Sequence, residues 1–259
     1  MITVDKARQH LQALGLKDAA EVLEARLERA AKQDVTYADF LVDLLETELA
    51  VRRRRYLDTR TKLARLPFRK TLEDFDFEAQ PSIDPRQIRE LATLRFLGNA
   101  ENVIFLGPPG VGKTHLAVSL GLAAIDRGYG VYFTPMHRLI EDLRNAYEER
   151  RLERRMRIYL APKLLIIDEL GYLPLDKVGA TVFFQLVAAR YERGSIVLTS
   201  NQTFADWGEV FGDPVIATAI LDRLLHHSHV INIRGESYRL REKRRSGLLR
   251  STVDPNQDD

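Results

Sequence analysis

Cysteine is absent from the 259 residues of this chain. Its absence excludes disulfide bonds and thiolate metal sites, and it is typical of proteins that work in a reducing compartment. No apolar run approaches the roughly 18 residues that a membrane-spanning helix needs. A secretory signal is not expected either, because charged side chains occur from Asp5 onward. We therefore expect a cytoplasmic protein.

Net charge is also almost lacking, but the charges are unevenly distributed. The formal net charge is +2. Residues 51–70 nevertheless carry 9 basic side chains against the single Asp58, and residues 234–250 carry 7 against Glu236 and Glu242. Basic clusters in a nearly neutral chain indicate contact with an anionic partner.

The first 66 residues lack the alternating β-branched pattern of strands, and apolar residues recur there at helical spacing. Thr36 and Asp39 have the spacing of a capping box, so a long amphipathic helix is expected to start there. Pro67 would end that helix near Leu66. A small all-α domain is therefore expected at residues 1–66.

The predicted long helix carries the first basic cluster. At 100° per residue, one face of it would hold Arg52, Arg55, Lys62 and Arg65. Such a face is typical of a helix that lies along the phosphate backbone of DNA. A solvated basic face, or a contact with an acidic protein surface, is the alternative that the sequence leaves open.

Residues 67–100 are interpreted as a linker with a docking segment. Aromatic and acidic residues mix between Pro67 and Pro85 without a helical period. We expect Phe75 and Phe77 to anchor this linker by packing rather than to stack on nucleic-acid bases. A short helix at 88–97 is expected to lead into the next domain.

The strongest motif of the chain follows. Residues 103–106 are apolar and predict a buried strand, residues 107–114 spell G-x-x-x-x-G-K-T, and a helical apolar period comes next. This order is that of a P-loop, in which backbone amides and a helix N-terminus surround phosphates. Lys113 would reach the β and γ phosphates, and the Thr114 hydroxyl would bind Mg²⁺. The expected nucleotide-binding residues are Gly107, Pro108, Pro109, Gly110, Val111, Gly112, Lys113, Thr114 and His115.

Residues 101–245 alternate apolar strands with helices, which predicts an α/β core with a parallel sheet covered on both faces. The apolar run 164–167 is followed by Asp168 and Glu169, at the strand end where ligands bind in such sheets. Asp168 would hold Mg²⁺, mostly through water. Glu169 would polarise the water that attacks the γ-phosphate, and Asn201 would hold that water or contact the γ-phosphate. A polar tail, residues 246–259, follows the core.

The nucleotide is expected to be ATP, so that the chain would be a Mg²⁺-dependent ATPase. Residues 168–171 match the D-x-x-G of GTPases, but no N-K-x-D motif that reads the guanine base follows. A small-molecule kinase is the alternative enzyme class. Its lid would have to be 150–157, a segment that is more typical of an exposed helix with mixed charges.

Several segments together resemble the AAA+ ATPases of the DnaC/IstB group, and within it the IstB-type helper ATPases of insertion-sequence transposition. The matching segments are 107–115, 164–173, 198–201, 222–226, 235–239, the basic helix, 70–77 and 204–208. The resemblance implies a P-loop AAA+ core with a five-stranded parallel sheet behind the helical domain. It also implies ATP-dependent assembly of a homo-oligomer on duplex DNA, and a partner transposase of the integrase type.

Two arginines gain roles only from this resemblance. Arg223 resembles the arginine finger that reaches the γ-phosphate of a neighbouring subunit, and Arg239 resembles the second sensor arginine within its own subunit. No C-terminal helical lid domain is expected after Arg245, in contrast to fuller AAA+ proteins. A replicative helicase loader of the DnaC type is the close alternative, and it would prefer single-stranded DNA. The basic helix and the linker favour the transposition branch.

Overall fold

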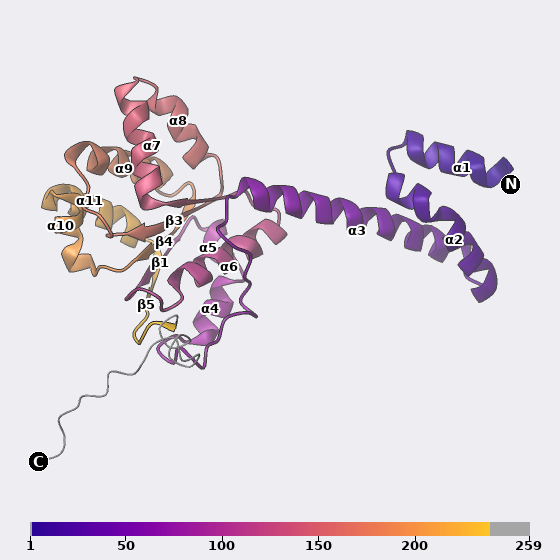
Figure 1. Ribbon diagram of the computed structural model, residues 1–259, viewed down its shortest axis with the longest axis horizontal. Coiled ribbons are helices and arrows are strands. Elements are labelled where there is room, and N and C mark those ends of the chain that lie inside the picture. Colours follow the sequence, from indigo (N-terminus) through magenta and orange to yellow (C-terminus); the bar gives the residue numbers. More distant parts are fainter. Residues whose placement is uncertain (1, 239–259) are drawn as a thin grey trace, which may run out of the picture. The chain divides into compact units, whose positions relative to one another are not determined.

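The computed structural model describes residues 2–238, which divide between two compact units, Met1–Arg60 and Thr61–Asp259. The first unit consists of helices α1 (Ile2–Ala13), α2 (Lys17–Gln33) and the first part of α3 (Tyr37–Leu63) (Figure 1). Its apolar core is small and centres on the buried side chains of Ala19, Leu23 and Leu44. The helical N-terminal region predicted from the sequence is therefore present.

A buried carboxylate joins the helices of this unit. Glu48 on α3 is 3% exposed and accepts hydrogen bonds from the backbone amides of Asp18 and Ala19, at 2.9 and 3.1 Å. These amides lie in the first turn of α2, where backbone donors lack partners within the helix. Together with an ion pair to Arg52, they lower the pKa of Glu48.

Helix α3 begins as predicted and ends earlier than predicted. Thr36 donates its hydroxyl to the Asp39 carboxylate at 2.6 Å and accepts the Asp39 amide at 3.2 Å, which confirms the predicted start. The helix ends at Leu63 rather than near Leu66. Arg65 adopts the left-handed region with φ 56°, and the Ala64 carbonyl accepts a bond from the Phe133 amide. A contact with a distant strand thus replaces the last helical turn.

The linker contains two short helices instead of the single one predicted at 88–97. These are α4 (Pro85–Leu91) and α5 (Arg95–Gly98). Asp84 caps α4 by accepting the Arg86 amide at 2.8 Å. The single-helix prediction was wrong because Leu94, between the two helices, has a left-handed backbone with φ 65°.

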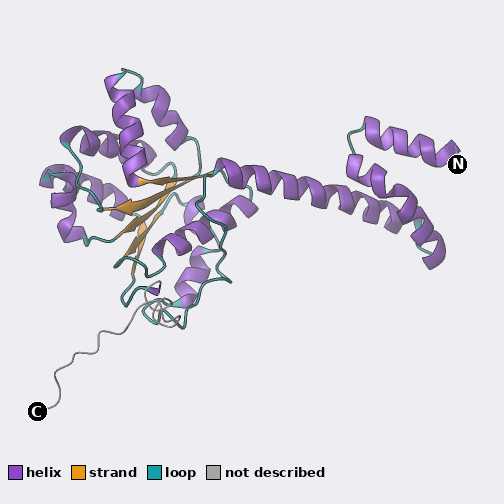
Figure 2. Cartoon of the chain, in the orientation of Figure 1, coloured by secondary structure: helices purple, strands orange, loops and turns teal. Residues whose placement is uncertain are grey.

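A parallel sheet of five strands forms the centre of the second unit (Figure 2). Its strands are β1 (Asn102–Leu106), β2 (Val131–Pro135), β3 (Leu164–Leu170), β4 (Ser195–Ser200) and β5 (Ser228–Asn232). Their order in the sheet is β2-β3-β4-β1-β5, with every pair parallel. Every residue of β1 and β4 is buried, which explains why their sequences are continuous rather than alternating apolar runs.

Helices cover both faces of this sheet (Figure 1). They are α6 (Lys113–Asp126), α7 (Met136–Glu148), α8 (Leu152–Leu160), α9 (Lys177–Arg190), α10 (Trp207–Phe211) and α11 (Pro214–Leu225), with the 3-10 turn η1 (Phe204–Asp206) before α10. The main core lies between the sheet and helices α7 to α11. No helix among residues 2–238 combines the length and apolar character that crossing a bilayer requires. The predicted α/β core with a covered parallel sheet is confirmed.

Candidate nucleotide-binding site

The P-loop connects the end of β1 to the start of α6. Gly107 follows the last residue of β1, and helix α6 begins at Lys113. Gly112 has φ 99°, and a Cβ at this position would lie 2.6 Å from a ring carbon of Phe75. At Gly107 a Cβ would lie 2.2 Å from the carbonyl oxygen of Ile233. Both positions therefore require glycine, for the backbone angle and for the close neighbours.

Lys113 lies inside the loop that it follows. Its ammonium group donates to the carbonyls of Gly107 and Pro108 at 2.6 and 2.8 Å, and the side chain is 8% exposed. A positive charge and the N-terminus of a 14-residue helix thus meet at one point. Both favour an anion at this place.

Asp168 and two hydroxyl groups form a cluster of oxygen atoms beside the loop. The Thr114 hydroxyl donates to the two carboxylate oxygens at 2.9 and 3.1 Å, and Thr199 donates to one of them at 2.6 Å. Asp168 is 6% exposed. A carboxylate and a threonine hydroxyl are the hard oxygen ligands that suit Mg²⁺. The residues present therefore fit this metal ion.

Glu169 and Asn201 lie at the carboxyl ends of β3 and β4. The Glu169 side chain is exposed, although the other residues of β3 are buried. Asn201 follows β4, and its amide oxygen is buried without a hydrogen-bond partner among the described residues. A buried acceptor without a partner is costly unless a ligand or a water molecule meets it. Both side chains therefore have the placement expected of groups that contact a water molecule or a phosphate.

A cavity of about 430 Å³ brings these groups together. Its volume lies in the usual range for small-molecule sites. Residues of the P-loop, of the two strand ends and of the linker all line it. The residues that line it include Lys113, Thr114, Glu169, Thr199 and Asn201 from the core, and Phe68, Lys70, Asp74, Phe75 and Gln80 from the linker.

The linker is held against the P-loop and helix α6 by specific contacts. His115 bonds through Nε2 to the Thr71 carbonyl at 2.9 Å, and Ser119 donates to the Lys70 carbonyl at 3.1 Å. The Phe75 ring is 8% exposed and lies 5.2 Å from the His115 ring. Phe75 therefore packs as predicted, and it is also part of the cavity wall. The sequence pattern predicted that Phe75 packs against the core, but it did not indicate that Phe75 lines the cavity.

An ionised carboxylate belongs to this wall. The Thr71 amide donates to Asp74 at 2.8 Å, and this bond lowers the pKa of Asp74. Lys70 lines the cavity beside it. The linker thus offers both signs of charge to a ligand.

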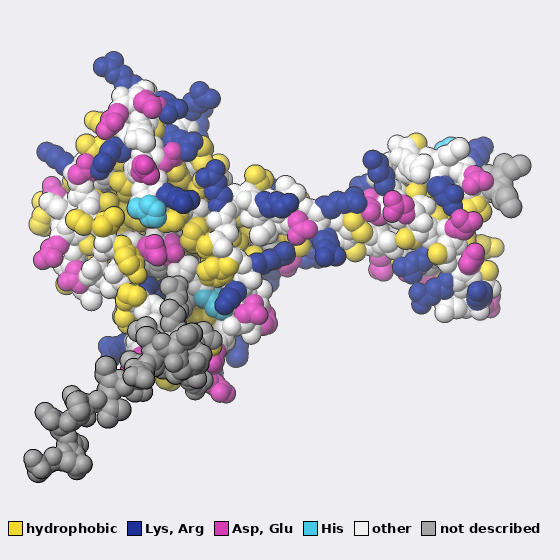
Figure 3. All heavy atoms as spheres, in the orientation of Figure 1, with side chains coloured by type: hydrophobic (Ala, Val, Ile, Leu, Met, Phe, Trp, Pro, Cys, Tyr) yellow, Lys and Arg dark blue, Asp and Glu magenta, His cyan; other side chains and the backbone are white. Residues whose placement is uncertain are grey.

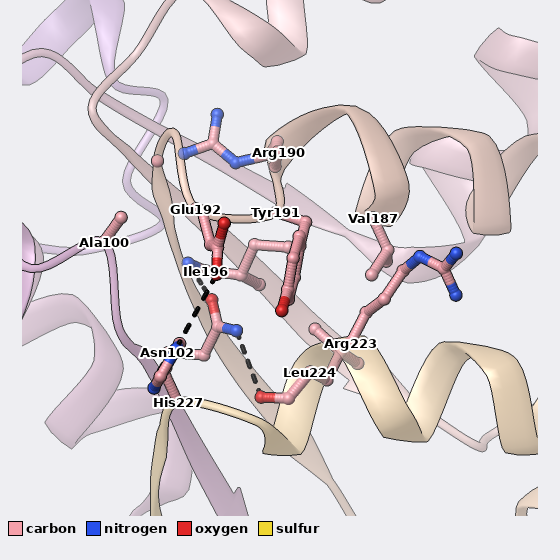
Figure 4. Close-up of a pocket in the computed structure, with 11 residues that line it drawn as sticks. Ala100, Asn102, Val187, Arg190, Tyr191, Glu192, Ile196, Arg223, Leu224 and His227 are labelled. Atoms are coloured by element: carbon pink, nitrogen blue, oxygen red, sulfur yellow. Dashed lines mark hydrogen bonds and ion pairs between the residues drawn. The ribbon is translucent and has the colours of Figure 1, made fainter.

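Arg223 is not among the residues that line this cavity, and it lines a different, small pocket (Figure 4). It occupies the last turn of α11, where it donates to the Ala219 carbonyl at 3.0 Å and lies 4.8 Å from the centre of the Phe184 ring. It lines a small pocket with Asn102, the first residue of β1, whereas the P-loop follows the last residue of β1. The structure thus places Arg223 and the P-loop of one chain at opposite ends of the same strand. Arg239 lies outside the described residues.

The four basic residues predicted to share a face are only partly brought together. Arg52 and Arg55 belong to the first unit, where they pair with Glu48 at 2.8 Å and Asp18 at 2.9 Å. Both remain more than half exposed. Lys62 is exposed near the end of α3. The prediction of a common helical face is wrong for Arg65, because α3 ends before this residue and its guanidinium lies 5.4 Å from the centre of the Tyr132 ring.

Comparison with known protein families gives one extended match. A family model described as IstB-like ATP binding protein matches residues 9–246. A candidate ATP-binding protein of insertion sequence IS21 from Pseudomonas aeruginosa is 53% identical over 249 residues, which cover 96% of this chain and 94% of that protein. Its counterpart in insertion sequence IS5376 of Geobacillus stearothermophilus is 51% identical over 240 residues, which cover 93% and 96%.

Two solved structures share the fold. DnaI is 19% identical with a TM-score of 0.55, and the match covers 67% of this chain and 93% of that one. AMPPCP-bound DnaA from Aquifex aeolicus is 17% identical with a TM-score of 0.56, and the match covers 74% and 58%. Identities this low concern the fold alone, and the fold is the predicted P-loop AAA+ core.

Proposed function

Since the chain belongs to the family of IstB-like ATP-binding proteins, we propose that it hydrolyses ATP with Mg²⁺ and uses bound ATP to assemble on duplex DNA beside a partner transposase. The observation that carries the ATPase part is the meeting of Lys113, Thr114, Asp168, Glu169 and Asn201 at one edge of the sheet. Together they cover phosphate binding, metal binding, proton transfer and positioning of water, and a single cavity or hydrogen-bond cluster connects them.

In this proposal the P-loop amides and Lys113 bind the phosphates of ATP. Thr114 and Asp168 hold Mg²⁺, which neutralises charge that develops on the transferred phosphoryl group. Glu169 accepts a proton from the attacking water, because its carboxylate is exposed at the end of β3, directly after Asp168. Asn201 orients this water through its amide oxygen, which has no hydrogen-bond partner within residues 2–238.

A second copy of the chain is required to complete the site. Arg223 lies at the opposite end of β1 from the P-loop, so it cannot serve the cavity of its own chain. An arginine supplied by a neighbour stabilises the transition-state charge in other nucleotide hydrolases. We assign Arg223 this role and Arg239 the role of a sensor within its own subunit, the latter on resemblance alone. The site then connects hydrolysis with assembly.

The DNA-binding part of the proposal depends on exposed basic side chains. Lys and Arg side chains gather along the visible face of α3 (Figure 3). Arg52, Arg55, Lys62 and Arg65 are all exposed and can neutralise phosphates of a duplex. The insertion-sequence origin of the relatives supports a transposase as the protein partner.

Titration calorimetry with ATP tests the nucleotide site. Lys113→Ala is expected to weaken ATP binding by at least about tenfold, since hydrogen bonds to charged groups contribute about 1.5–3 kcal/mol. Lys163→Ala is the matched control. Lys163 directly precedes β3, so it lies at the amino ends of the strands, and the P-loop follows the carboxyl end of β1. Unchanged ATP affinity in Lys113→Ala would contradict the assignment of this loop.

A further inference from the structure

A β-bulge at the end of β3 places two acidic residues opposite one threonine. The register of β3 and β4 passes from the pair Ile167–Leu198 to the pair Leu170–Ser200. Asp168 and Glu169 therefore share a single opposite residue, Thr199. Bulges bend a strand and redirect side chains next to active sites. This bulge leaves Glu169 exposed in a strand that is otherwise buried.

The backbone of Glu169 is strained. Its φ is 65°, in the left-handed region that residues with a Cβ rarely adopt. Such a conformation persists only where surrounding interactions hold it, and these conformations cluster at functional sites. Glutamate has no side-chain reason to prefer this region, in contrast to glycine or asparagine. Some neighbouring group must therefore hold the bulge.

Thr199 is hydrogen-bonded to both residues of the bulge. Its hydroxyl accepts a hydrogen bond from the Glu169 amide at 2.9 Å and donates one to Asp168 at 2.6 Å. A hydroxyl has one proton and two lone pairs, so it can make both bonds at once. Thr199 is 1% exposed, so its hydroxyl makes these bonds inside the protein, where losing a partner is costly.

We propose that Thr199 is a positioning residue for ATP hydrolysis, whose hydroxyl locks the β3 bulge and thereby aims the Glu169 carboxylate into the nucleotide cavity. The inference rests on the proposed ATPase function. The same hydroxyl fixes Asp168, whose carboxylate also accepts the Thr114 hydroxyl. A continuous series of hydrogen bonds thus connects the P-loop threonine with the backbone of the catalytic base.

Three variants of the full-length chain separate positioning from packing. Thr199→Val keeps the shape and removes the hydroxyl, whereas Thr199→Ser keeps the hydroxyl. Ser195→Ala is the matched control, because Ser195 is a fully buried hydroxyl at the other end of β4 that donates to the Phe96 carbonyl. If the Thr199 hydroxyl had only a structural role, Thr199→Val and Ser195→Ala would change kcat to the same extent.

The kinetic readout is kcat for ATP together with the affinity for ADP. Thr199→Val is expected to lower kcat by about 10- to 100-fold, the usual effect of losing an outer-shell partner, with ADP affinity unchanged. Thr199→Ser and Ser195→Ala are expected to keep kcat. In the Glu169→Gln background the valine change is expected to lower kcat by a smaller factor than in the wild type, because the part of the effect that passes through Glu169 is already lost and only the part through Asp168 remains. Unchanged kcat in Thr199→Val, or an equally large loss in that background, would overturn the proposal.

Amide hydrogen exchange, measured by NMR without nucleotide, provides a readout that needs no activity. The Glu169 amide is expected to exchange at least about tenfold faster in Thr199→Val, because its protecting bond is lost, and at the native rate in Thr199→Ser. An unchanged exchange rate of the Glu169 amide in Thr199→Val would contradict the proposal that the Thr199 hydroxyl holds the β3 bulge. A wild-type protein that hydrolyses no ATP would overturn the proposed function instead, and the exchange result distinguishes these two failures.

Discussion

Thr114 and Asp168 join the P-loop to strand β3 through one hydroxyl that donates to both carboxylate oxygens, at 2.9 and 3.1 Å. The two residues are separated by 54 positions in the sequence, yet the parallel sheet brings them into direct contact. Because ligands of open α/β sheets bind at the carboxyl ends of the strands, this contact marks the place where Mg²⁺ and phosphate would meet.

Removing the Thr114 hydroxyl is expected to abolish the effect of Mg²⁺. Thr114→Ala lacks a ligand oxygen, so adding Mg²⁺ would no longer strengthen ATP binding, and hydrolysis would fall by about 10²-fold. Thr114→Ser keeps the hydroxyl and is expected to behave like the wild type. Calorimetry with and without Mg²⁺ checks this, and an equal Mg²⁺ effect in the alanine variant would contradict the metal assignment.

Arg223 is expected to act on the nucleotide of a neighbouring copy. Arg223→Ala would bind ATP but lose about 10²-fold in kcat, since it lacks an electrostatic contact to the transition state. Glu169→Gln would bind ATP and hydrolyse it slowly. Each variant supplies what the other lacks when both occur in one assembly.

A mixing experiment measures this complementation. In an equal mixture, about a quarter of the sites would combine an intact Glu169 with an Arg223 from the neighbour, so about a quarter of wild-type ATPase activity is expected. The unmixed variants are the controls. A mixture that is no more active than its components would contradict the role of Arg223 between subunits.

Two basic residues are expected to contact the DNA backbone. Arg55→Ala combined with Lys62→Ala would weaken duplex binding and flatten the slope of log affinity against log salt by about one to two units, because each lost phosphate contact releases about one fewer counterion. Asp18→Asn is the matched control, since it breaks the Arg55 ion pair and keeps the Arg55 charge. A salt titration of the double variant that matches the wild type would favour a merely solvated basic face.

The buried Glu48 is expected to make the N-terminal unit sensitive to acid. Its folded-state pKa is lowered by the Ala19 amide and Arg52, so its stabilising effect is complete above the ordinary glutamate pKa of about 4.3 and is lost as the pH falls through the folded-state value. Glu48→Gln is expected to lower the unfolding temperature at pH 7 and to reduce the loss on acidification. Circular dichroism melts from pH 7 to pH 3 check this, and parallel curves for both proteins would contradict it.

Local motifs could be predicted from the sequence because they depend on interactions between residues that are close together in the chain. The P-loop was recognisable from residues 102–115 alone, and its strand, loop and helix occur as predicted. The helix start at Thr36 was predicted from a three-residue spacing, and the structure shows both of its bonds. The acidic pair after residue 167 was likewise assigned to a strand end.

Features that depend on contacts between residues far apart in the chain could not be predicted from the sequence. Directly after the end of α3, the Ala64 carbonyl accepts a bond from the amide of the distant Phe133. The bulge at Asp168 and Glu169 lies opposite Thr199, which follows Glu169 by 30 residues. The only sign of Thr199 in the sequence is a hydroxyl residue that directly follows the apolar run 196–198. The cavity wall made by the linker is a long-range contact of the same kind.

The mass of Glu169→Gln particles on DNA tests the central claim most directly. Mass photometry would compare duplex with single-stranded DNA of equal length, with and without ATP. We predict a large particle that forms on duplex DNA only with ATP, because hydrolysis is blocked and Arg223 needs a neighbouring copy. A monomer indifferent to DNA would contradict the account, and an ATP-dependent particle that prefers single strands would indicate a helicase loader instead.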